Sequence, residues 1–329
     1  MRIGLIGTGR IGAFHARTLR DHPQVDSLVV CDQDQARAKE VADSLDVQLA
    51  GDVQELWDSS ADAVVIASAT SSHAELITAA SDRGLPTFCE KPIALDLSGT
   101  ERALRHVQEA GVPLQIGFMR RFDAGYVAAR NAVRAGWLGR LHTLRAVTSD
   151  PAPPPADYLP HSGGLYRDCL VHDFDAIRWV TGREVRQVFA LGSDAGPPMF
   201  REAGDVDTAA CLLTLDDGVL CTATATRING AGYDVRLELA GEEDQLAVGL
   251  GPRTPLTSLE PEATASVEPA WPGFLERFAP AYREELAAFV RLARGEGENP
   301  CDGREALAAL RVAEACERSR EEGVPIPLA

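Results

Sequence analysis

The first twelve residues constrain the fold more than any other part of the chain. A short apolar run at 3–6 leads directly into Gly7, Gly9 and Gly12, which are spaced as Gly-x-Gly-x-x-Gly, and a helical pattern follows. In such a sequence the first glycine allows a tight turn, the second lets the backbone approach a pyrophosphate, and the third lets the helix pack on the strand. The phosphates then meet free N–H groups at the helix N-terminus. The sequence therefore predicts a dinucleotide-binding strand, turn and helix.

A carboxylate follows where such a site needs one. Asp32 lies at the end of the apolar run 27–31, about 20 residues after the last glycine, where an acid binds the ribose hydroxyls of NAD. The same charge repels the 2′-phosphate of NADP, so the pattern favours NAD and leaves NADP open. Arg37 could offset that repulsion, although a solvated position on the next helix is the simpler interpretation. A glycine-rich turn that binds nothing is disfavoured by this combination of strand, glycines, helix and acid.

Length and charge narrow the classes of protein to which the chain can belong. With 329 residues it is too long for a single hydrophobic core, so two domains are expected. The net charge of −17 argues against nucleic-acid binding, which needs a basic surface. No apolar run is long enough to cross a membrane, and the chain opens on a strand of the fold rather than on a signal peptide. We expect a cytoplasmic protein whose seven scattered cysteines are mostly small buried thiols.

The first 118 residues alternate between strand-like and helical patterns. Helical stretches at 12–21, 35–45, 73–83 and 96–110 separate apolar runs at 3–6, 28–31, 63–67, 86–89 and 113–117. This alternation predicts an α/β domain with a doubly wound parallel sheet of the Rossmann type, which binds ligands at the carboxyl ends of its strands. We place this NAD-binding domain at residues 1–120.

The pattern changes in residues 121–329, where an α+β domain for substrate binding and oligomerisation is expected. After a helix at 123–135, strands are predicted at 141–148, 185–193, 206–215, 218–227, 234–240 and 244–249, with one helix at 168–181 and a hairpin turn at Asp217-Gly218. Proline- and glycine-rich loops are expected at 150–164 and 249–273. The chain ends in helices at 282–294 and 304–322, which could pack back toward the first domain. An open, mostly antiparallel sheet leaves one face to cover, so a homodimer or homotetramer is expected.

Lys91 lies where the nicotinamide of a bound dinucleotide would reach. It follows the strand at 86–89 within Glu90-Lys91-Pro92, which places it on the carboxyl edge of the predicted sheet. The proline favours an extended conformation for the lysine. From position alone, a solvated lysine beside Glu90 is an equally open interpretation.

A second polar group lies on the predicted helix 168–181. Asp168, His172 and Asp175 recur at i, i+4 and i+7, on one face of a helix whose other positions are mostly apolar. Hydride transfer from an alcohol needs a base for the hydroxyl proton, and histidine titrates nearest to neutral pH. A carboxylate would orient the ring, and the Lys91 ammonium would stabilise the developing alkoxide. A metal site and a structural role are the alternatives, and we favour acid–base chemistry without a metal.

Together these motifs resemble the glucose–fructose oxidoreductase, inositol dehydrogenase and rhizopine catabolism family. The resemblance rests on the glycine motif with His15, on Glu90-Lys91-Pro92, on Gly163-Gly164 and on Asp168-x-x-x-His172, in the family's order and over essentially the whole chain. It implies two domains, bound NAD or NADP and, in most members, oxidation of sugar or polyol hydroxyls. It also implies that His172 is the base, that Asp168 is its partner and that Lys91 holds the reacting hydroxyl.

Within the family, the chain is most similar to the inositol 2-dehydrogenases. Residues 117–126, 170–175 and 229–234 carry this similarity. The residues expected at the cofactor are Gly7, Gly9, Arg10, Ile11, Gly12, Asp32, Thr70, His73 and Glu90. His73 is included because of its place after the strand 63–67. Those expected at the polyol are Arg121, Asp150, Asp175, Tyr233 and Tyr282.

One segment departs from that subgroup. Inositol dehydrogenases tend to carry a His-Arg-Asn-Pro-like stretch where this chain has Thr148-Ser149-Asp150-Pro151, so an acid replaces an amide, and a proline-rich loop follows. The reaction class is therefore better supported than the polyol. We expect NAD-dependent oxidation of a cyclic polyol or sugar, with myo-inositol to 2-keto-inositol as the first candidate. The alternatives are another sugar or polyol, an NAD-dependent glycosidase, and a non-catalytic dinucleotide sensor.

Overall fold

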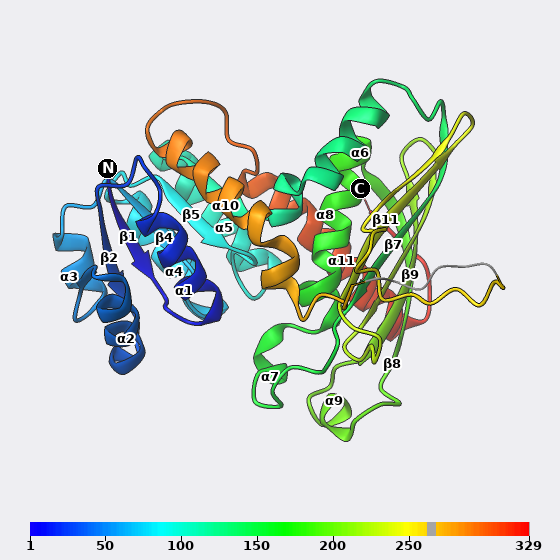
Figure 1. Cartoon of the computed structure of the whole chain (residues 1–329), viewed down its shortest axis with the longest axis horizontal. Helices are drawn as coiled ribbons and strands as arrows, with labels where there is room; N and C mark the ends of the chain where they lie inside the picture. Colours follow the sequence, from blue (N-terminus) through cyan, green and yellow to red (C-terminus); the bar gives the residue numbers. More distant parts are fainter. Residues whose placement is uncertain (262–267, 329) are drawn as a thin grey trace. The chain divides into compact units, whose positions relative to one another are not determined.

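The structure, a computed structural model, describes residues 1–261 and 268–328. Its contacts divide the chain into two compact units (Figure 1). The first unit comprises residues 1–122 and 280–307, and the second comprises residues 123–279 and 308–329. Two segments of the chain therefore contribute to each unit. The boundaries at residues 279/280 and 307/308 fall within the two C-terminal helices, so each of these helices has residues in both units.

The sheet of the first unit is parallel throughout. Its six strands follow the order β3-β2-β1-β4-β5-β6, which confirms the predicted doubly wound Rossmann arrangement. The order reverses between β1 and β4, and ligands bind such sheets at the carboxyl ends of the strands beside that reversal. The strands are β1 (Arg2–Ile6), β2 (Ser27–Cys31), β3 (Gln48–Leu49), β4 (Ala63–Ile66), β5 (Thr87–Glu90) and β6 (Leu114–Gly117).

Aspartates start three of the five helices that connect these strands. Asp34, Asp52 and Asp96 each accept a hydrogen bond from a backbone N–H of the first turn, which satisfies a donor that the helix itself cannot pair. Gly111, with φ of 68°, ends the last of these helices in the left-handed region. The helices are α1 (Arg10–Arg20), α2 (Gln35–Leu45), α3 (Val53–Asp58), α4 (Thr70–Ser81) and α5 (Leu97–Ala110).

The core of the first unit joins β1 to helices from both ends of the chain. Ile3 and Leu5 are fully buried among side chains of α1 and of α10 (Phe274–Ala293), whose Leu286 and Phe289 are also fully buried. Burial of each such side chain contributes about 1.5–3 kcal/mol to folding. This packing holds the glycine turn that follows β1 in a fixed position.

The second unit contains a seven-stranded sheet that is antiparallel except for one pair. Its order is β12-β11-β7-β10-β9-β8-β13, and only β7 and β10 run parallel among the described pairs. This confirms the predicted mostly antiparallel sheet, including the hairpin turn at Gly218, whose φ is 87°. The strands are β7 (Leu141–Ser149), β8 (Val185–Ser193), β9 (Thr208–Leu215), β10 (Leu220–Thr226), β11 (Asp234–Gly241), β12 (Gln245–Val248) and β13 (Ile326–Pro327).

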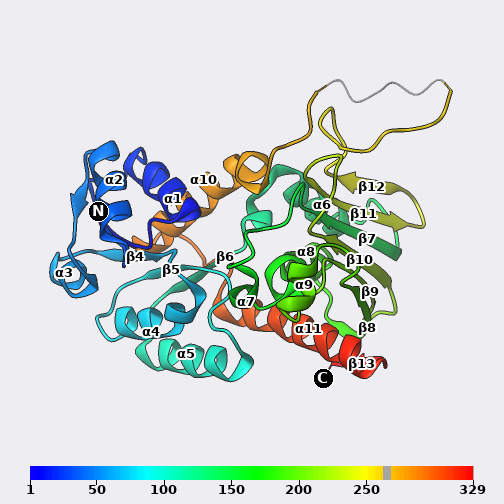
Figure 2. The ribbon, with the colours of Figure 1, turned by 90° about the horizontal axis from the view of Figure 1, so that it is seen from below.

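Helices cover one face of this sheet (Figure 2). They are α6 (Ala124–Arg134), α8 (Val171–Thr181) and the second-unit part of α11 (Gly303–Glu322). Side chains alternate accordingly: Leu213 on β9 and Ala223 on β10 are fully buried, whereas their neighbours Leu212 and Thr222 are exposed. The opposite face of the sheet is therefore open within this unit.

Several local features differ from the sequence-based expectations. The predicted helix 168–181 starts with a π-helical turn, η2 (Tyr166–Leu170), before α8 begins. Short elements that lacked a periodic signal are also present, namely α3, β3, β13, α7 (Leu159–Ser162) and α9 (Pro198–Glu202). Part of the loop predicted at 249–273, residues 262–267, lies outside the described residues.

In the described ranges, no helix combines the length and apolar character needed to cross a membrane.

Candidate active site

The glycine turn after β1 has the geometry that its sequence predicts. Gly7 has φ of 97°, and a Cβ there would lie 2.5 Å from the backbone of Ala67. A Cβ on Gly12 would lie 1.9 Å from the carbonyl oxygen of Gly7, so only glycine allows the helix to approach the turn. Space is left beside Gly9, where a Cβ would have its nearest neighbour 3.8 Å away, on the side chain of Arg37.

The N-terminus of α1 fits an anion. Gly9 precedes the helix and provides no side-chain hydrogen bond to its first N–H groups. Arg10 is exposed and Ile11 is half-buried in the first turn. The turn can therefore hold the pyrophosphate of NAD, with backbone N–H groups as the donors.

Asp32 is held rigidly at the end of β2. Its Oδ2 accepts hydrogen bonds from the backbone N–H and the hydroxyl of Thr8 at 2.6 and 3.0 Å, and its Oδ1 accepts from the N–H of Asp34 at 2.8 Å. A carboxylate has about four acceptor positions, so capacity for a ribose hydroxyl remains. Arg37 is about half exposed and pairs with Asp34 at 3.0 Å, near enough to Gly9 to lie beside a bound dinucleotide.

His73 connects the loops that follow β4 and β5. It lies on α4, which begins with the half-buried Thr70, and its ring is buried. Its Nδ1 lies 2.7 Å from the carbonyl oxygen of Pro92, and its Nε2 lies 3.0 Å from that of Ser68. Burial lowers the pKa of His73, although both carbonyl contacts act in the opposite direction. His73 thus links the two loops that flank the carboxyl edge of the sheet.

Glu90, the last residue of β5, connects this strand to α1. Its Oε1 lies 2.7 Å from Nε2 of His15, which is fully buried, so His15 is a packing residue with a polar partner rather than a surface residue of the helix. Tyr282 of α10 packs against this ring, with centroids 5.8 Å apart. The next residue, Lys91, is half-buried and precedes a cis peptide bond to Pro92. The residues on either side of Lys91 are therefore held by side chains of other elements, Glu90 by His15 and Pro92 by His73.

Arg121 is engaged within the first unit. Its guanidinium donates to Glu305 at 2.8 Å and to the carbonyl oxygen of Pro300 at 3.1 Å, and its side chain is only 4% exposed. These contacts fasten the end of the first segment of the unit to its C-terminal segment. Contact of Arg121 with substrate stays a prediction.

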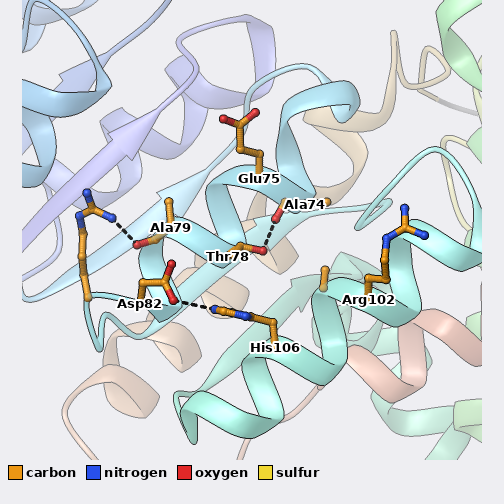
Figure 3. A pocket seen from close by; sticks show the side chains of 10 residues that line it. Ala74, Glu75, Thr78, Ala79, Asp82, Arg102 and His106 are labelled. Carbon is orange, nitrogen blue, oxygen red and sulfur yellow. Dashed lines mark hydrogen bonds and ion pairs between the residues drawn. The ribbon is translucent and has the colours of Figure 1, made fainter.

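A hollow on the first unit lies apart from the predicted site residues. Side chains of α4, of the turn that follows it and of α5 line it, and the pair Asp82–His106, 2.8 Å apart, spans it (Figure 3). None of the residues expected at the cofactor or the polyol belongs to its lining. The hollow is a groove between two surface helices and is not assigned to the chemistry.

In the second unit, Asp168 lies in the turn η2 and His172 lies at the start of α8. The Oδ1 of Asp168 accepts a hydrogen bond from the hydroxyl of Tyr158 at 3.1 Å, and its Oδ2 accepts from Nη2 of Arg227 at 2.7 Å. Arg227 also lies 3.4 Å from Oδ2 of Asp150. Arg227 was not among the predicted site residues, because nothing in its local sequence shows that a residue following a strand becomes buried.

The remaining predicted substrate residues of this unit are buried. Asp175 on α8 is fully buried, and Tyr233, which directly precedes β11, is 5% exposed. Burial also raises the pKa of Asp150 above its usual value, with Arg227 acting against this rise and Asp168 reinforcing it. Within residues 1–261 and 268–328, no three His, Cys, Asp or Glu side chains are grouped so that they could hold a metal ion.

The two units thus carry different groups of predicted site residues. The first holds a glycine turn and the carboxylate predicted to bind a ribose, and the second holds a histidine that follows a fixed aspartate by one helical turn. A Rossmann sheet with this turn and an α+β unit with titratable side chains define the class of dinucleotide-dependent oxidoreductases.

Comparison with known protein families identifies the family. Residues 1–118 match the domain described as "Oxidoreductase family, NAD-binding Rossmann fold", and residues 126–247 match the "GFO/IDH/MocA C-terminal domain". The chain belongs to this family. It is an NAD-dependent oxidoreductase that acts on CH–OH groups, as the resemblance implied.

Similar proteins extend over the full length of the chain. Myo-inositol dehydrogenase Hyg17 of Streptomyces leeuwenhoekii is 40% identical over 99% of both chains. Among solved structures, a myo-inositol dehydrogenase from Corynebacterium glutamicum superposes with a TM-score of 0.91 at 33% identity, covering 100% of this chain and 99% of that one. Scyllo-inositol dehydrogenase from Lactobacillus casei, solved with NAD(H) and scyllo-inositol, has a TM-score of 0.89 at 29% identity and covers 99% and 98%.

Proposed function

We propose that this protein oxidises one secondary hydroxyl of a cyclic polyol to a ketone with NAD, and that myo-inositol is its substrate and 2-keto-inositol its product. Full-length similarity to inositol dehydrogenases supports the substrate class. The arrangement of polar residues at the start of α8 supports the reaction. The acidic Asp150, where the subgroup tends to have an amide, is the reason to test other cyclitols beside myo-inositol.

The observation that carries the proposal is the exposure of His172 on an otherwise buried segment. His172 is partly exposed, whereas its neighbours Val171 and Asp173 are 2% and 1% exposed and Phe174 is fully buried. An imidazole that reaches solvent from a buried stretch of helix is placed to accept the proton of a substrate hydroxyl. Asp173 accepts a hydrogen bond from the hydroxyl of Thr148 at 2.7 Å and is thereby engaged elsewhere.

The other site residues take the roles that this reaction needs. Asp168 supports the protonated imidazole of His172, and the ammonium of Lys91 stabilises the oxygen as it loses its proton. When bound, NAD would supply the acceptor for the hydride. The polyol contacts of Arg121, Asp150, Asp175, Tyr233 and Tyr282 and the cofactor contacts of Arg10, Ile11, Thr70, His73 and Glu90 belong to the same proposal.

Turnover of purified protein tests the proposal directly. NADH formation is followed by absorbance with NAD or NADP and a panel of inositol stereoisomers, pyranoses and linear polyols. Robust oxidation of myo-inositol with NAD is expected. Activity on a sugar but on no inositol would overturn the assignment of myo-inositol as substrate, but the proposed NAD-dependent oxidation of a hydroxyl would stand. Silence across the panel with NAD bound would favour the sensor, and turnover of a glycoside without added NAD would favour the glycosidase.

We also propose a homodimer or homotetramer in which the open face of the second-unit sheet is covered by another copy. Leu191, Leu212 and Leu220, on the adjacent strands β8, β9 and β10, are 57%, 47% and 47% exposed. Exposed apolar side chains on neighbouring strands favour association. Leu212→Lys is expected to reduce the molar mass measured by light scattering. An unchanged mass would place any interface elsewhere.

The cytoplasm is the expected location. All seven cysteines lie in the described part of the chain and are thiols that form no disulfide there, the state that a reducing compartment maintains. Fractionation of cells with an antibody to the protein would check this expectation.

A further inference from the structure

The parallel pair β7 and β10 brings two chain segments together at one edge of the second-unit sheet. Ser149 and Thr226 are partners at the ends of these strands, so Asp150 and Arg227 follow side by side. The N–H of Asp150 donates to the carbonyl oxygen of Thr226 at 2.9 Å, which fixes this register. Because the other described strand pairs of this sheet are antiparallel, only this pair makes two carboxyl ends adjacent.

Arg227 is a deeply buried cation at this edge. Its side chain is 4% exposed, and its backbone N–H donates to the carbonyl oxygen of Asp207 at 2.8 Å. Its guanidinium reaches Asp168 at 2.7 Å and Asp150 at 3.4 Å. A buried charge is tolerated only when it is paired and hydrogen-bonded, so Arg227 and these carboxylates depend on one another.

The shorter contact shows which carboxylate Arg227 holds more firmly. Charge-assisted hydrogen bonds are typically about 2.7–2.9 Å, so the contact with Asp168 is a full bond, while that with Asp150 is longer than this range. The second oxygen of Asp168 accepts from the hydroxyl of Tyr158. Both carboxylate oxygens of Asp168 are therefore fixed by residues that come from other parts of the unit.

We infer that Arg227 is a positioning residue of the reaction proposed above: through its ion pair it sets the orientation and charge of the Asp168 carboxylate, and thereby the basicity of His172. This inference rests on the proposed function. Arg227 touches neither cofactor nor reacting hydroxyl in this role and acts through Asp168. The same guanidinium also lies near Asp150, the acid that stands where inositol dehydrogenases tend to have an amide. Asp150 is therefore a second partner of Arg227.

The pH dependence of activity separates positioning from a structural role. The groups that face Arg227 are Asp150, Asp168, Cys169 and Asp205, together with Tyr158 across Asp168. Loss of the positive charge makes protonation of both Asp168 and His172 easier. The acidic limb of the kcat/KM profile, which reports the protonation of His172, should therefore move to higher pH in Arg227→Gln.

Kinetic measurements on three variants accompany this profile. In Arg227→Gln, kcat with the best polyol should fall at least about 10-fold while the Kd of NAD stays unchanged. Arg227→Lys keeps the charge but loses the planar fork, so it should restore the acidic limb and part of kcat. Tyr158→Phe removes the other contact with Asp168 and should lower kcat several-fold.

A matched control lies on the helix that carries His172. Arg178 is similarly buried, at 6% exposed, and pairs with Glu184 through two contacts of 2.7 Å. Arg178→Gln should lower the Tm without moving the pH profile. If Arg227→Gln behaves like Arg178→Gln, with a lower Tm and an unchanged profile, Arg227 is structural and the inference is overturned.

The outcomes also separate this inference from the proposed function. A wild-type protein that oxidises no polyol contradicts the proposed function. An active wild type with an unshifted Arg227→Gln profile contradicts only the positioning role. Should Arg227→Gln fail to fold, Arg227→Lys and Tyr158→Phe decide, because wild-type kcat and profile in both would show that Asp168 needs no support from this cluster.

Discussion

His172 is the residue on which the proposed chemistry depends most directly. His172→Ala should lower kcat by about 100- to 10,000-fold, the usual contribution of a general base, while the Kd of NAD changes little. Steady-state kinetics and a fluorescence titration with NAD measure the two quantities. His142→Ala is the matched control, since His142 is an exposed histidine of the same unit that contacts the carbonyl oxygen of Gly241. Loss of NAD binding in His172→Ala would instead make this histidine structural.

Asp32 is the residue proposed to set the choice between NAD and NADP. Asp32→Ala removes a charged acceptor for the ribose hydroxyls, so KM for NAD should rise about 10- to 100-fold, as for loss of a hydrogen bond to a charged group. Discrimination against NADP should relax, because the repelling charge is gone. Asp52→Ala, which removes a helix cap in the same unit, should leave the ratio of kcat/KM for the two dinucleotides unchanged. A wild-type preference for NADP would contradict this role.

At the scale of elements, the sequence predicted what depends on local patterns. Five of the six strands of the first unit, α2 at residues 35–45 and the hairpin at Gly218 follow from periodicity, glycine and charge. The two-residue β3 and the π-helical start of α8 were missed, because such short features carry no periodic signal. The contacts of Arg227 with Asp150 and Asp168 were missed for another reason: they depend on the register between strands far apart in sequence, which no local pattern specifies.

The link between α1 and the end of β5 gives an element-scale prediction. His15→Phe keeps an aromatic side chain, with a ring somewhat larger than imidazole, but leaves the part-buried Glu90 carboxylate without its partner. An unsatisfied buried group costs about 1–3 kcal/mol, so the Tm should fall by several degrees. Thermal unfolding followed by circular dichroism measures this shift.

The surface pair Asp82–His106 is the control for the buried pair His15–Glu90. Its Nε2–O distance of 2.8 Å matches the 2.7 Å of His15–Glu90, but the His106 side chain is 35% exposed and that of His15 is fully buried. Exposed ion pairs contribute about 0–1 kcal/mol, so His106→Phe should leave the Tm nearly unchanged. Equal shifts in the two variants would show that burial does not determine the value of the His15–Glu90 contact.

At the scale of the whole molecule, cysteine burial can be measured in one experiment. Six of the seven cysteines are buried, and only Cys169, beside Asp168, is partly exposed. Thiol reagents react with the thiolate, and burial raises the pKa of Cys31 to about 11 and that of Cys221 to about 12. At mildly alkaline pH these two groups therefore stay protonated as well as inaccessible.

A disulfide reagent added to the native protein should therefore modify one thiol per chain quickly, and all seven after denaturation. Cys169→Ala should abolish the fast phase of the reaction, while the other six cysteines should still react after denaturation. Because the Cys169 sulfur lies 3.8 Å from Oδ2 of Asp150, its modification should also stop turnover, and bound NAD with polyol should slow it. Two or more fast thiols in the native protein would contradict the burial of the remaining cysteines, and a fast phase that persists in Cys169→Ala would assign the reactive thiol to another position.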